Sequence, residues 1–161
     1  MIIGIGGPSQ AGKSTLAKGL LERLEGSVSI LSQDDFVKAE HDIPMVRDRI
    51  DWESPLSINL DKLLQHLEEL SSANSTVIVE GIFAYSFPEL NAIYDKAILI
   101  EIDKPTFWNR RKKETRWGKE PDWFLEHVWS AYMNNKQAVP EPKLVVTNDH
   151  PIQKVLTFLA E

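Results

Sequence analysis

The chain has 161 residues and a net charge of −6, with 42% hydrophobic residues, 26% charged residues and no cysteine. This size and composition are typical of a single globular domain with its own core. The negative charge argues against a general nucleic-acid surface, and the lack of cysteine excludes disulfides, thiolate metal sites and a cysteine nucleophile. No signal peptide or membrane-length apolar run is visible, so we expect a cytoplasmic protein, monomeric or homodimeric, that binds neither membrane nor nucleic acid.

Short apolar runs alternate with helical patterns along the chain. Strands are predicted at residues 2–5, 28–31, 76–79, 97–102 and 143–147. Helices are predicted directly after the first strand and its loop, and at residues 60–70, 105–116, 122–137 and 152–160. This alternation predicts an α/β fold in three layers, with a parallel sheet covered on both faces. Residues 37–50 are irregular and charged, and we expect them to pass over the edge of the sheet.

The first strand leads into GPSQAGKS, which fits the pattern G-x-x-x-x-G-K-[ST] of a phosphate-binding P-loop (Walker A). Glycines let backbone N–H groups wrap closely around a triphosphate, and the following helix directs its positive end at the phosphates. Lys13 would reach the β- and γ-phosphates of ATP, and the Ser14 hydroxyl would bind Mg²⁺. The candidate nucleotide-binding residues are Gly7, Pro8, Ser9, Gln10, Ala11, Gly12, Lys13, Ser14 and Thr15.

Polar residues follow several of the other predicted strands. Ligands of such sheets bind at the carboxyl ends of the strands. Gly7, Asp34, Glu80 and the helix after Asp103 all lie just past such an end. We therefore expect these positions to converge on one site.

Asp34 and Asp35 are the candidate acids after the second strand. A carboxylate beside the γ-phosphate can accept the proton of an attacking hydroxyl. Because neighbours on an extended segment point in opposite directions, we favour Asp34 as the base, with Asp35 nearer to solvent or metal. Both are candidate substrate-binding residues, and Asp34 is also a candidate metal ligand. The alternative is that both acids only cap or solvate a loop.

Two further carboxylates are candidate ligands. Asp51 lies in a turn before a helix, where it can accept hydrogen bonds from the paired hydroxyls of a ribose. The alternative is a turn or capping residue. Glu80 ends a strand and is suited to hold a water of Mg²⁺, the alternative being a charge that faces solvent. The candidate metal ligands are Ser14, Asp34 and Glu80.

The segment from residue 104 to residue 119 has seven basic residues and one acidic residue. Lys112 and Arg116 are four apart, which predicts one helical face, and Arg111 is adjacent to that face. We expect residues 111–121 to form a helical lid whose cations neutralise phosphate charge, with Lys112 and Arg116 as catalytic cations and Arg111 binding ATP. The alternative is a solvated basic face.

Other residues of the segment receive different predictions. Trp117, beside the expected hinge of the lid, is the candidate for stacking on a substrate base. Arg110 and Lys113 are expected to be solvated. The four histidines show no metal-ligand spacing and receive no role: His41, His66, His127 and His150.

Five segments, GPSQAGKSTLA, ISQDDF, DWESP, VEGIFAY and RRKKETR, occur in the order seen in the uridine kinase and nicotinamide riboside kinase family. The chain resembles this family from residue 2 to about residue 137, and WFLEHVWSAY is more similar to nicotinamide riboside kinases. The resemblance implies a P-loop kinase fold with a five-stranded parallel sheet and a small lid. It also implies transfer of the ATP γ-phosphate to the 5′-hydroxyl of a ribonucleoside.

By position, the resemblance makes Asp34 the base, Asp51 the ribose ligand, Glu80 a holder of Mg²⁺, and Lys112 and Arg116 the lid cations. The chain departs from the family pattern at two places. Lys112 stands where arginine is usual and cannot make a bidentate phosphate contact. Ile50 stands where an aromatic residue often packs on the base. The chain is also shorter than typical uridine kinases.

The leading hypothesis is an ATP- and Mg²⁺-dependent nucleoside kinase that forms one domain over residues 1–161. One alternative is a P-loop kinase for another small hydroxyl compound, such as a sugar or a pantothenate-like molecule. Another is a non-catalytic nucleotide-binding switch, although the sequence lacks the N-K-x-D signature that would indicate guanine binding.

Overall fold

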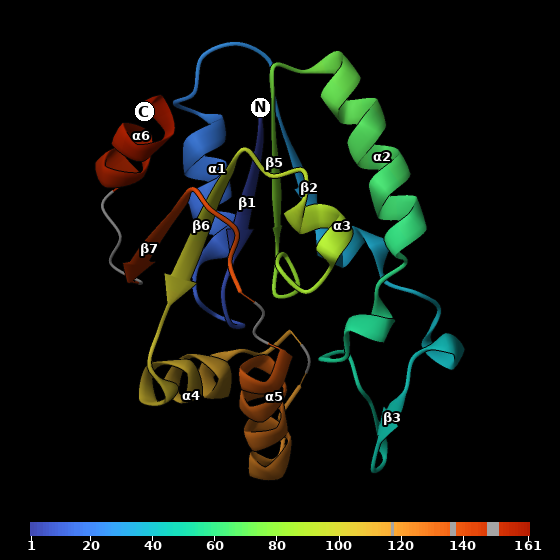
Figure 1. Ribbon diagram of the computed structural model, residues 1–161. Helices are drawn as coiled ribbons and strands as arrows, with labels where there is room; N and C mark the ends of the chain where they lie inside the picture. Colours follow the sequence, from blue (N-terminus) through green and yellow to red (C-terminus); the bar gives the residue numbers. More distant parts are fainter. Residues whose placement is uncertain (117, 136–137, 148–151) are drawn as a thin grey trace.

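A five-stranded parallel sheet forms the centre of the computed structural model, with strand order β2-β5-β1-β6-β7 (Figure 1). The structure describes residues 1–116, 118–135, 138–147 and 152–161. The strands are β1 (Ile2–Gly6), β2 (Val28–Ser32), β5 (Thr76–Gly81), β6 (Lys96–Glu101) and β7 (Lys143–Thr147). The helices are α1 (Lys13–Leu21), α2 (Leu60–Ala73), α3 (Pro88–Asn91), α4 (Lys104–Lys113), α5 (Asp122–Asn135) and α6 (Ile152–Ala160). The predicted α/β class and five-stranded parallel sheet are confirmed.

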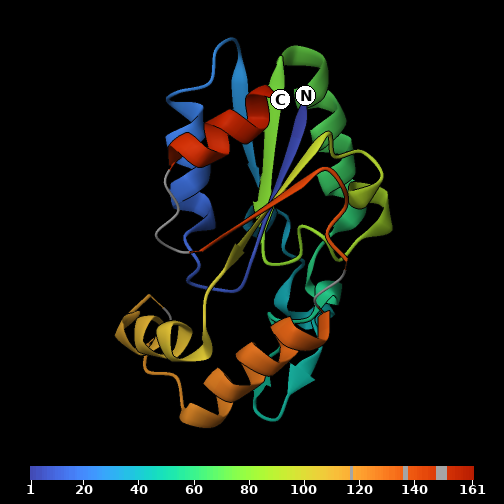
Figure 2. The same ribbon diagram turned by 60° about the vertical axis from the view of Figure 1, so that its left-hand side comes forward.

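Each face of the sheet buries its own apolar cluster. Residues Ile3 and Ile5 of β1 pack with α1 and α6 on one face. Val77 and Val79 of β5 pack with α2 and the segment around α3 on the other. Figures 1 and 2 show these helix pairs on opposite sides of the sheet. The continuous apolar strands therefore reflect burial on both faces.

Two glycines of β1 make room for tyrosines on the α2 and α3 face. A Cβ at Gly6 would lie 2.4 Å from the Tyr85 ring, and one at Gly4 would lie 3.0 Å from the Tyr94 ring. The Tyr85 hydroxyl lies 2.8 Å from the carbonyl oxygens of both Gly4 and Ile98. This contact ties the segment after β5 to the middle of the sheet.

A third cluster lies beyond the carboxyl ends of the strands. Phe107 of α4 and Phe124 and Val128 of α5 form its buried centre. The short antiparallel pair β3 (Met45–Val46) and β4 (Arg49–Ile50) lies at the same end of the molecule (Figures 1 and 2). Three 3₁₀-helices accompany this pair: η1 (Gln33–Phe36), η2 (Glu40–Asp42) and η3 (Pro55–Ser57). The irregular segment 37–50 thus belongs to a cap over the carboxyl edge.

The end of α4 differs from the prediction of a helix reaching residue 116. The helix ends at Lys113, and Glu114 is extended. The Glu114 carboxylate accepts hydrogen bonds from the backbone N–H groups of Thr115 and Arg116 and from the Arg116 guanidinium. These contacts stabilise a turn in place of another helical turn. The prediction that Lys112 and Arg116 share a helical face is therefore wrong.

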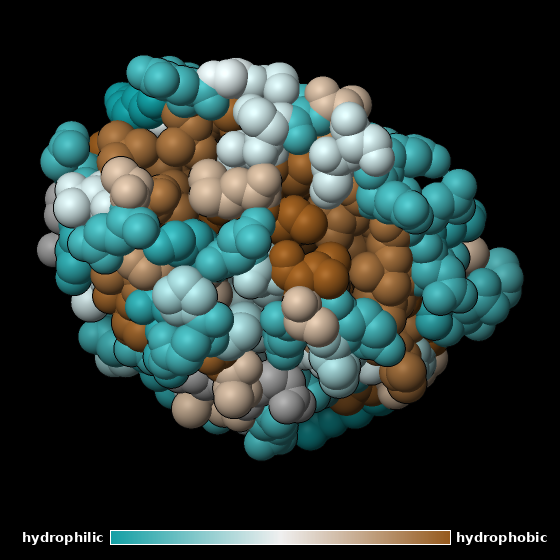
Figure 3. All heavy atoms as spheres, turned by 45° about the horizontal axis from the view of Figure 1, so that its top comes forward, coloured by the Kyte–Doolittle hydropathy of each residue, from teal (hydrophilic) through white to brown (hydrophobic). Residues whose placement is uncertain are grey.

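The surface and the remaining helices bear on the predictions about a membrane and about the helix at residues 122–137. On the face that carries both termini, hydrophilic residues form most of the outline and hydrophobic residues lie between them (Figure 3). Within the described ranges, no helix has the length and apolar character needed to cross a membrane. The predicted helix at 122–137 is described as far as Asn135, and residues 136–137 lie outside the described part.

Candidate active site at the carboxyl edge of the sheet

The P-loop connects β1 to α1 at the carboxyl edge. Gly7 has φ +152° and Gly12, the N-cap of α1, has φ +92°, both values that favour glycine. A Cβ at Gly7 would also lie 2.4 Å from the carbonyl oxygen of Ile100. The motif glycines are thus required by backbone conformation and by close approach to β6. The loop ends at a helix N-terminus, which is suited to an anion.

Lys13 lies inside this loop and is 9% exposed. Its Nζ donates a hydrogen bond to the carbonyl oxygen of Pro8, at 2.9 Å. Burial lowers the pKa of Lys13, and the carboxylates of Glu80, Asp34 and Glu53 oppose that shift. Carboxylates from three separate segments therefore act electrostatically on the P-loop lysine.

Glu80 lies at the end of β5 between two serine hydroxyls. Ser14 Oγ lies 3.2 Å from both carboxylate oxygens, and Ser32 Oγ donates to Oε1 at 2.7 Å. Glu80 is 5% exposed, so it does not face solvent. Hydroxyl and carboxylate oxygens are ligands that suit Mg²⁺, so these residues fit that ion. Sequence reasoning missed Ser32, because only the pairing of β2 with β5 brings it opposite Glu80.

Asp34 and Asp35 lie in η1 and are both exposed. The expectation of an extended segment is wrong, because residues 33–36 form a 3₁₀ turn. The Asp34 carboxylate opposes the lowering of the Lys13 pKa that burial causes, and it adds to the raised pKa of Arg116, of which Glu114 is the main cause. Asp34 therefore acts electrostatically on both the P-loop lysine and the segment after α4. The roles of both acids stay predictions.

Asp51 is held by a histidine from a distant helix. Its Oδ1 lies 2.7 Å from His127 Nε2 of α5 and accepts the backbone N–H of Glu53 at 3.3 Å. His127, to which the sequence analysis assigned no role, is therefore a direct partner of a candidate substrate ligand. The separation of 76 residues explains why no local pattern indicates this pair.

Glu53 is a buried acid that sequence reasoning did not select. It is 7% exposed, and burial raises its pKa to about 7, with Arg111 opposing and Asp51 adding to the shift. Within the described residues its carboxylate has no hydrogen-bond donor, while its backbone carbonyl accepts from Asn135 at 3.3 Å. The only sequence signal is its position two residues after Asp51 in DWESP.

The carboxyl-terminal half of α4 contacts the P-loop directly. Arg111 is 7% exposed, donates to Ser9 Oγ at 2.7 Å, and donates two parallel bonds to Glu120 at 2.6 and 2.9 Å. Arg110 Nη1 donates to the carbonyl oxygen of Gln10 at 2.9 Å. The expectation that Arg110 is solvated is therefore wrong, because its side chain reaches the P-loop. Lys113 is exposed, as expected.

The two predicted lid cations lie apart and on the surface. Lys112 Nζ lies 3.1 Å from Asp122 Oδ1, and Arg116 pairs with Glu114. The Arg116 guanidinium lowers the pKa of Glu114 to about 2. Trp117, the predicted stacking residue, lies outside the described residues. The lid at 111–121 therefore stays a prediction.

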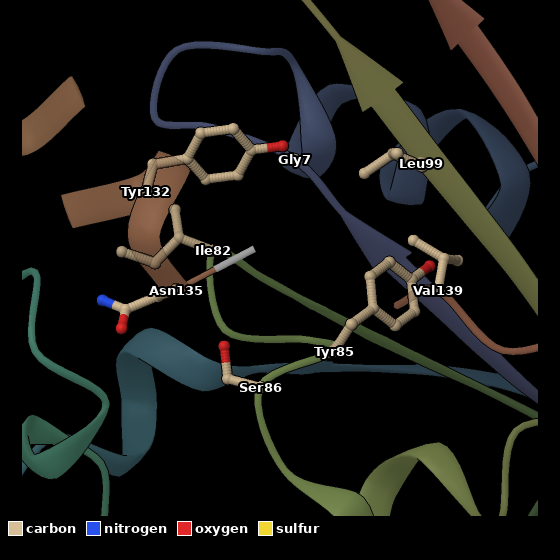
Figure 4. A pocket seen from close by; sticks show the side chains of 8 residues that line it. All are labelled: Gly7, Ile82, Tyr85, Ser86, Leu99, Tyr132, Asn135 and Val139. Atoms are coloured by element: carbon tan, nitrogen blue, oxygen red, sulfur yellow. The ribbon is translucent and has the colours of Figure 1, made fainter. Parts of the chain in front are cut away.

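A small cleft lies beside the start of the P-loop, between α5 and the segment after β5. Its lining residues are Gly7, Ile82, Tyr85, Ser86, Leu99, Tyr132, Asn135 and Val139. Tyr132 of α5 extends toward Gly7 (Figure 4), and burial together with Glu101 raises its pKa to about 12. Helix α5 therefore borders the P-loop as well as Asp51 and Glu53.

Comparison with known proteins shows to which family the chain belongs. Residues 3–150 match a family model described as an AAA domain. Nicotinamide riboside kinase 1 of Rattus norvegicus is 29% identical over 155 residues, covering 84% of this chain and 78% of the relative. A uridine kinase of Staphylococcus epidermidis is 27% identical over 175 residues, covering 92% and 84%. The resemblance inferred from the motifs is thereby confirmed.

The solved structures support the fold. Shikimate kinase from Bacteroides thetaiotaomicron superposes with a TM-score of 0.60, at 18% identity, over 100% of this chain and 99% of that one. At this identity the likeness establishes the fold, which is that of P-loop kinases.

Proposed function

This chain belongs to the AAA domain family and has a P-loop kinase fold, and on that premise we propose that it is an ATP-dependent nucleoside kinase. It transfers the γ-phosphate of ATP to the 5′-hydroxyl of a ribonucleoside. The observation that carries the proposal is that the Glu80 carboxylate lies 3.2 Å from the Ser14 hydroxyl of the P-loop, while Asp34 and Glu53 act electrostatically on the buried amine of Lys13. Such carboxylates could serve a hydroxyl substrate and a metal ion, and the adjacent P-loop could bind the triphosphate.

The P-loop side binds ATP. Backbone N–H groups of residue 7 and residues 9–14 would surround the phosphates, with Lys13 on the β- and γ-phosphates. Arg110 and Arg111 support the loop through Gln10 and Ser9. Ser14 and Glu80 would hold Mg²⁺, which supplies neutralisation of phosphate charge when bound. The protein thus contributes mainly positioning and electrostatic stabilisation.

Asp34 acts as the base. The 5′-oxygen of the nucleoside forms a bond to the γ-phosphorus while the bond from that phosphorus to the β–γ bridging oxygen breaks, which releases ADP. The hydroxyl proton passes to the Asp34 carboxylate and then to solvent. Asp34 is exposed, so an incoming hydroxyl can reach it, and its carboxylate acts electrostatically on Lys13, which supports this role.

Asp51 and Glu53 bind the nucleoside. Asp51 is the predicted ribose ligand, but one of its oxygens is already engaged by His127 and by a backbone N–H. The Glu53 carboxylate, buried nearby without a hydrogen-bond donor in the described part of the chain, is the freer acceptor for ribose hydroxyls. We therefore extend the ribose site to both acids. An acidic site also favours a cationic nucleoside such as nicotinamide riboside over neutral uridine or cytidine.

The test is formation of a nucleoside 5′-monophosphate. Purified protein with Mg-ATP is offered uridine, cytidine, nicotinamide riboside, pantothenate and a blank, and ADP and products are measured by mass spectrometry. We expect one nucleoside to yield its 5′-monophosphate. The Asp34→Asn variant should be at least about a hundredfold slower with ATP binding retained, as for loss of a general base.

Asp61→Asn, which changes an exposed acid in the first turn of α2, is the matched control and should keep full activity. ADP release equal to the blank for every nucleoside contradicts the proposal. A product from pantothenate alone would instead indicate a kinase for another hydroxyl compound.

A further inference from the structure

One buried amide connects the two segments that carry Asp34 and Glu80. Gln33 directly precedes Asp34, is 1% exposed, and its Oε1 accepts the backbone N–H of Phe83 at 3.0 Å. That N–H defines the orientation of the amide, because only the oxygen can face a donor. The side chain thus crosses from η1 to the segment that follows β5.

The amide occupies the space where residue 81 would carry a side chain. A Cβ at Gly81 would lie 1.9 Å from Gln33 Oε1, 2.6 Å from Cδ and 2.8 Å from Cβ. Gly81 does not belong to the residues with positive φ, so packing against Gln33, rather than backbone conformation, requires a glycine here. Gln33 and Gly81 therefore fit each other closely.

The other end of the amide is unsatisfied. Gln33 Nε2 is buried and has no hydrogen-bond partner in the described residues. Leaving such a donor unpaired costs free energy, a cost that an apolar side chain of the same length would avoid. A glutamine here is consequently not explained by stability of the core.

We propose that Gln33 is a positioning residue that sets the distance between Asp34 and Glu80 through its contacts with Gly81 and Phe83. Each acid is one residue from this contact, Asp34 after Gln33 and Glu80 before Gly81. A movement of η1 relative to the end of β5 would separate the base from the metal-holding carboxylate. Misplacement by about 1 Å in such a site can reduce the rate about a hundredfold. The inference rests on the proposed function.

The test uses steady-state kinetics with the nucleoside that the unmodified protein phosphorylates. Gln33→Met keeps the length but removes the acceptor for Phe83, and Gln33→Asn keeps an amide that is too short to reach it. Both should lower kcat at least about tenfold while the KM for ATP changes less than about twofold. Gln65→Met, at an exposed glutamine of α2, is the matched control and should leave kcat unchanged.

A double-mutant cycle tests the contact itself. Gly81→Ala should lower kcat in the unmodified background, because its Cβ displaces the amide. In the Gln33→Ala background the same change should cost at least about fivefold less, since the contacts at 1.9 and 2.6 Å are gone and only the contact to Cβ remains. Gly19→Ala of α1 is the control, because its Cβ meets only the far ends of two flexible side chains, Ile152 at 2.9 Å and Arg23 at 3.8 Å.

Three results would overturn the inference while leaving the proposed function intact. The first is a kcat of the folded Gln33 variants within about twofold of that of the unmodified protein. The second is an equal fall of kcat, ATP affinity and melting temperature. The third is that the effects of Gln33→Ala and Gly81→Ala on kcat are additive. If the unmodified protein phosphorylates no nucleoside, the proposed function fails and this inference fails with it.

Discussion

The two sides of the candidate site are built in different ways. The phosphate side consists of residues 7–15 with Arg110 and Arg111, and its central part is one continuous loop. The acceptor side consists of residues 45–53 and α5, and its contacts join residues 76 and 82 positions apart. A site formed by backbone groups of consecutive residues depends only on the conformation of that one segment. Side chains from distant segments need the whole cap to be in place.

Helix α5 holds the acceptor side together. The guanidinium of Arg47 lies 4.4 Å from the Trp123 ring centre, and that of Arg49 lies 5.2 Å from the ring of Phe124. With the contact of His127 to Asp51, these stacks join β3 and β4 to one helix. The acceptor side is thus shaped by α5, whereas the phosphate side is shaped by its own backbone.

Removing a buried charge near the phosphate side should have the largest effect. Glu120→Gln leaves Arg111 without the carboxylate that holds it, and both side chains are 7% exposed. We expect a loss of about 3–5 kcal/mol in unfolding free energy, measured by urea denaturation. Asp122→Asn, which removes the exposed partner of Lys112, should cost less than about 1 kcal/mol. Similar losses in both variants would contradict the prediction.

Lys13→Ala tests the phosphate side by its activity. Loss of this cation should lower kcat about 10²–10³-fold, as when one transition-state donor is removed. Stability should not fall, because burial already disfavours the charged amine and lowers its pKa. Lys18→Ala, an exposed lysine of α1, is the control. Turnover within tenfold of the unmodified protein would remove Lys13 from the proposed role.

Glu53 should make stability depend on pH at the acceptor side. Its pKa is raised from 4.5 to about 7 in the folded chain, so the folded state keeps a proton that the unfolded state releases between these values. The resulting stabilisation is complete below pH 4.5 and is lost as pH rises through about 7.

The Glu53→Gln variant lacks this dependence. The unfolding free energies of the variant and the unmodified protein are measured by denaturation at pH 5 and at pH 8. The difference between them should shift by about 2–3 kcal/mol in favour of the variant from pH 5 to pH 8. Glu68→Gln, at an exposed residue of α2, should show no such gain. A constant difference between Glu53→Gln and the unmodified protein would show that Glu53 is ionised over the whole range.

The smallest effect is expected at His127. His127→Phe keeps an aromatic ring beside Phe124 but removes the donor to Asp51. Loss of one hydrogen bond should raise the KM for the nucleoside about fivefold and leave the KM for ATP unchanged. His41→Phe, at a side chain that is 82% exposed, is the control. An equal rise in both KM values would mean that the two sides are not independent.

Much of the fold could be predicted because its signals are local. All five strands of the sheet and the start of the P-loop helix were predicted, since apolar runs and the G-x-x-x-x-G-K-S pattern each occupy consecutive residues. Helix α3 was missed, because four residues are too few for a periodic pattern. The end of α4 was misplaced, because the Glu114 side chain stabilises a turn that helix periodicity does not reveal.

The sequence by itself determined the α/β class and the place of the phosphate side, because each depends on neighbouring residues. Only the tertiary structure brought Ser32 beside Glu80, His127 beside Asp51, and the buried Glu53 toward Lys13. These contacts depend on strand order and on how α5 packs over the sheet. The physical reason is that apolar periodicity determines which side of an element is buried but not which distant element covers it.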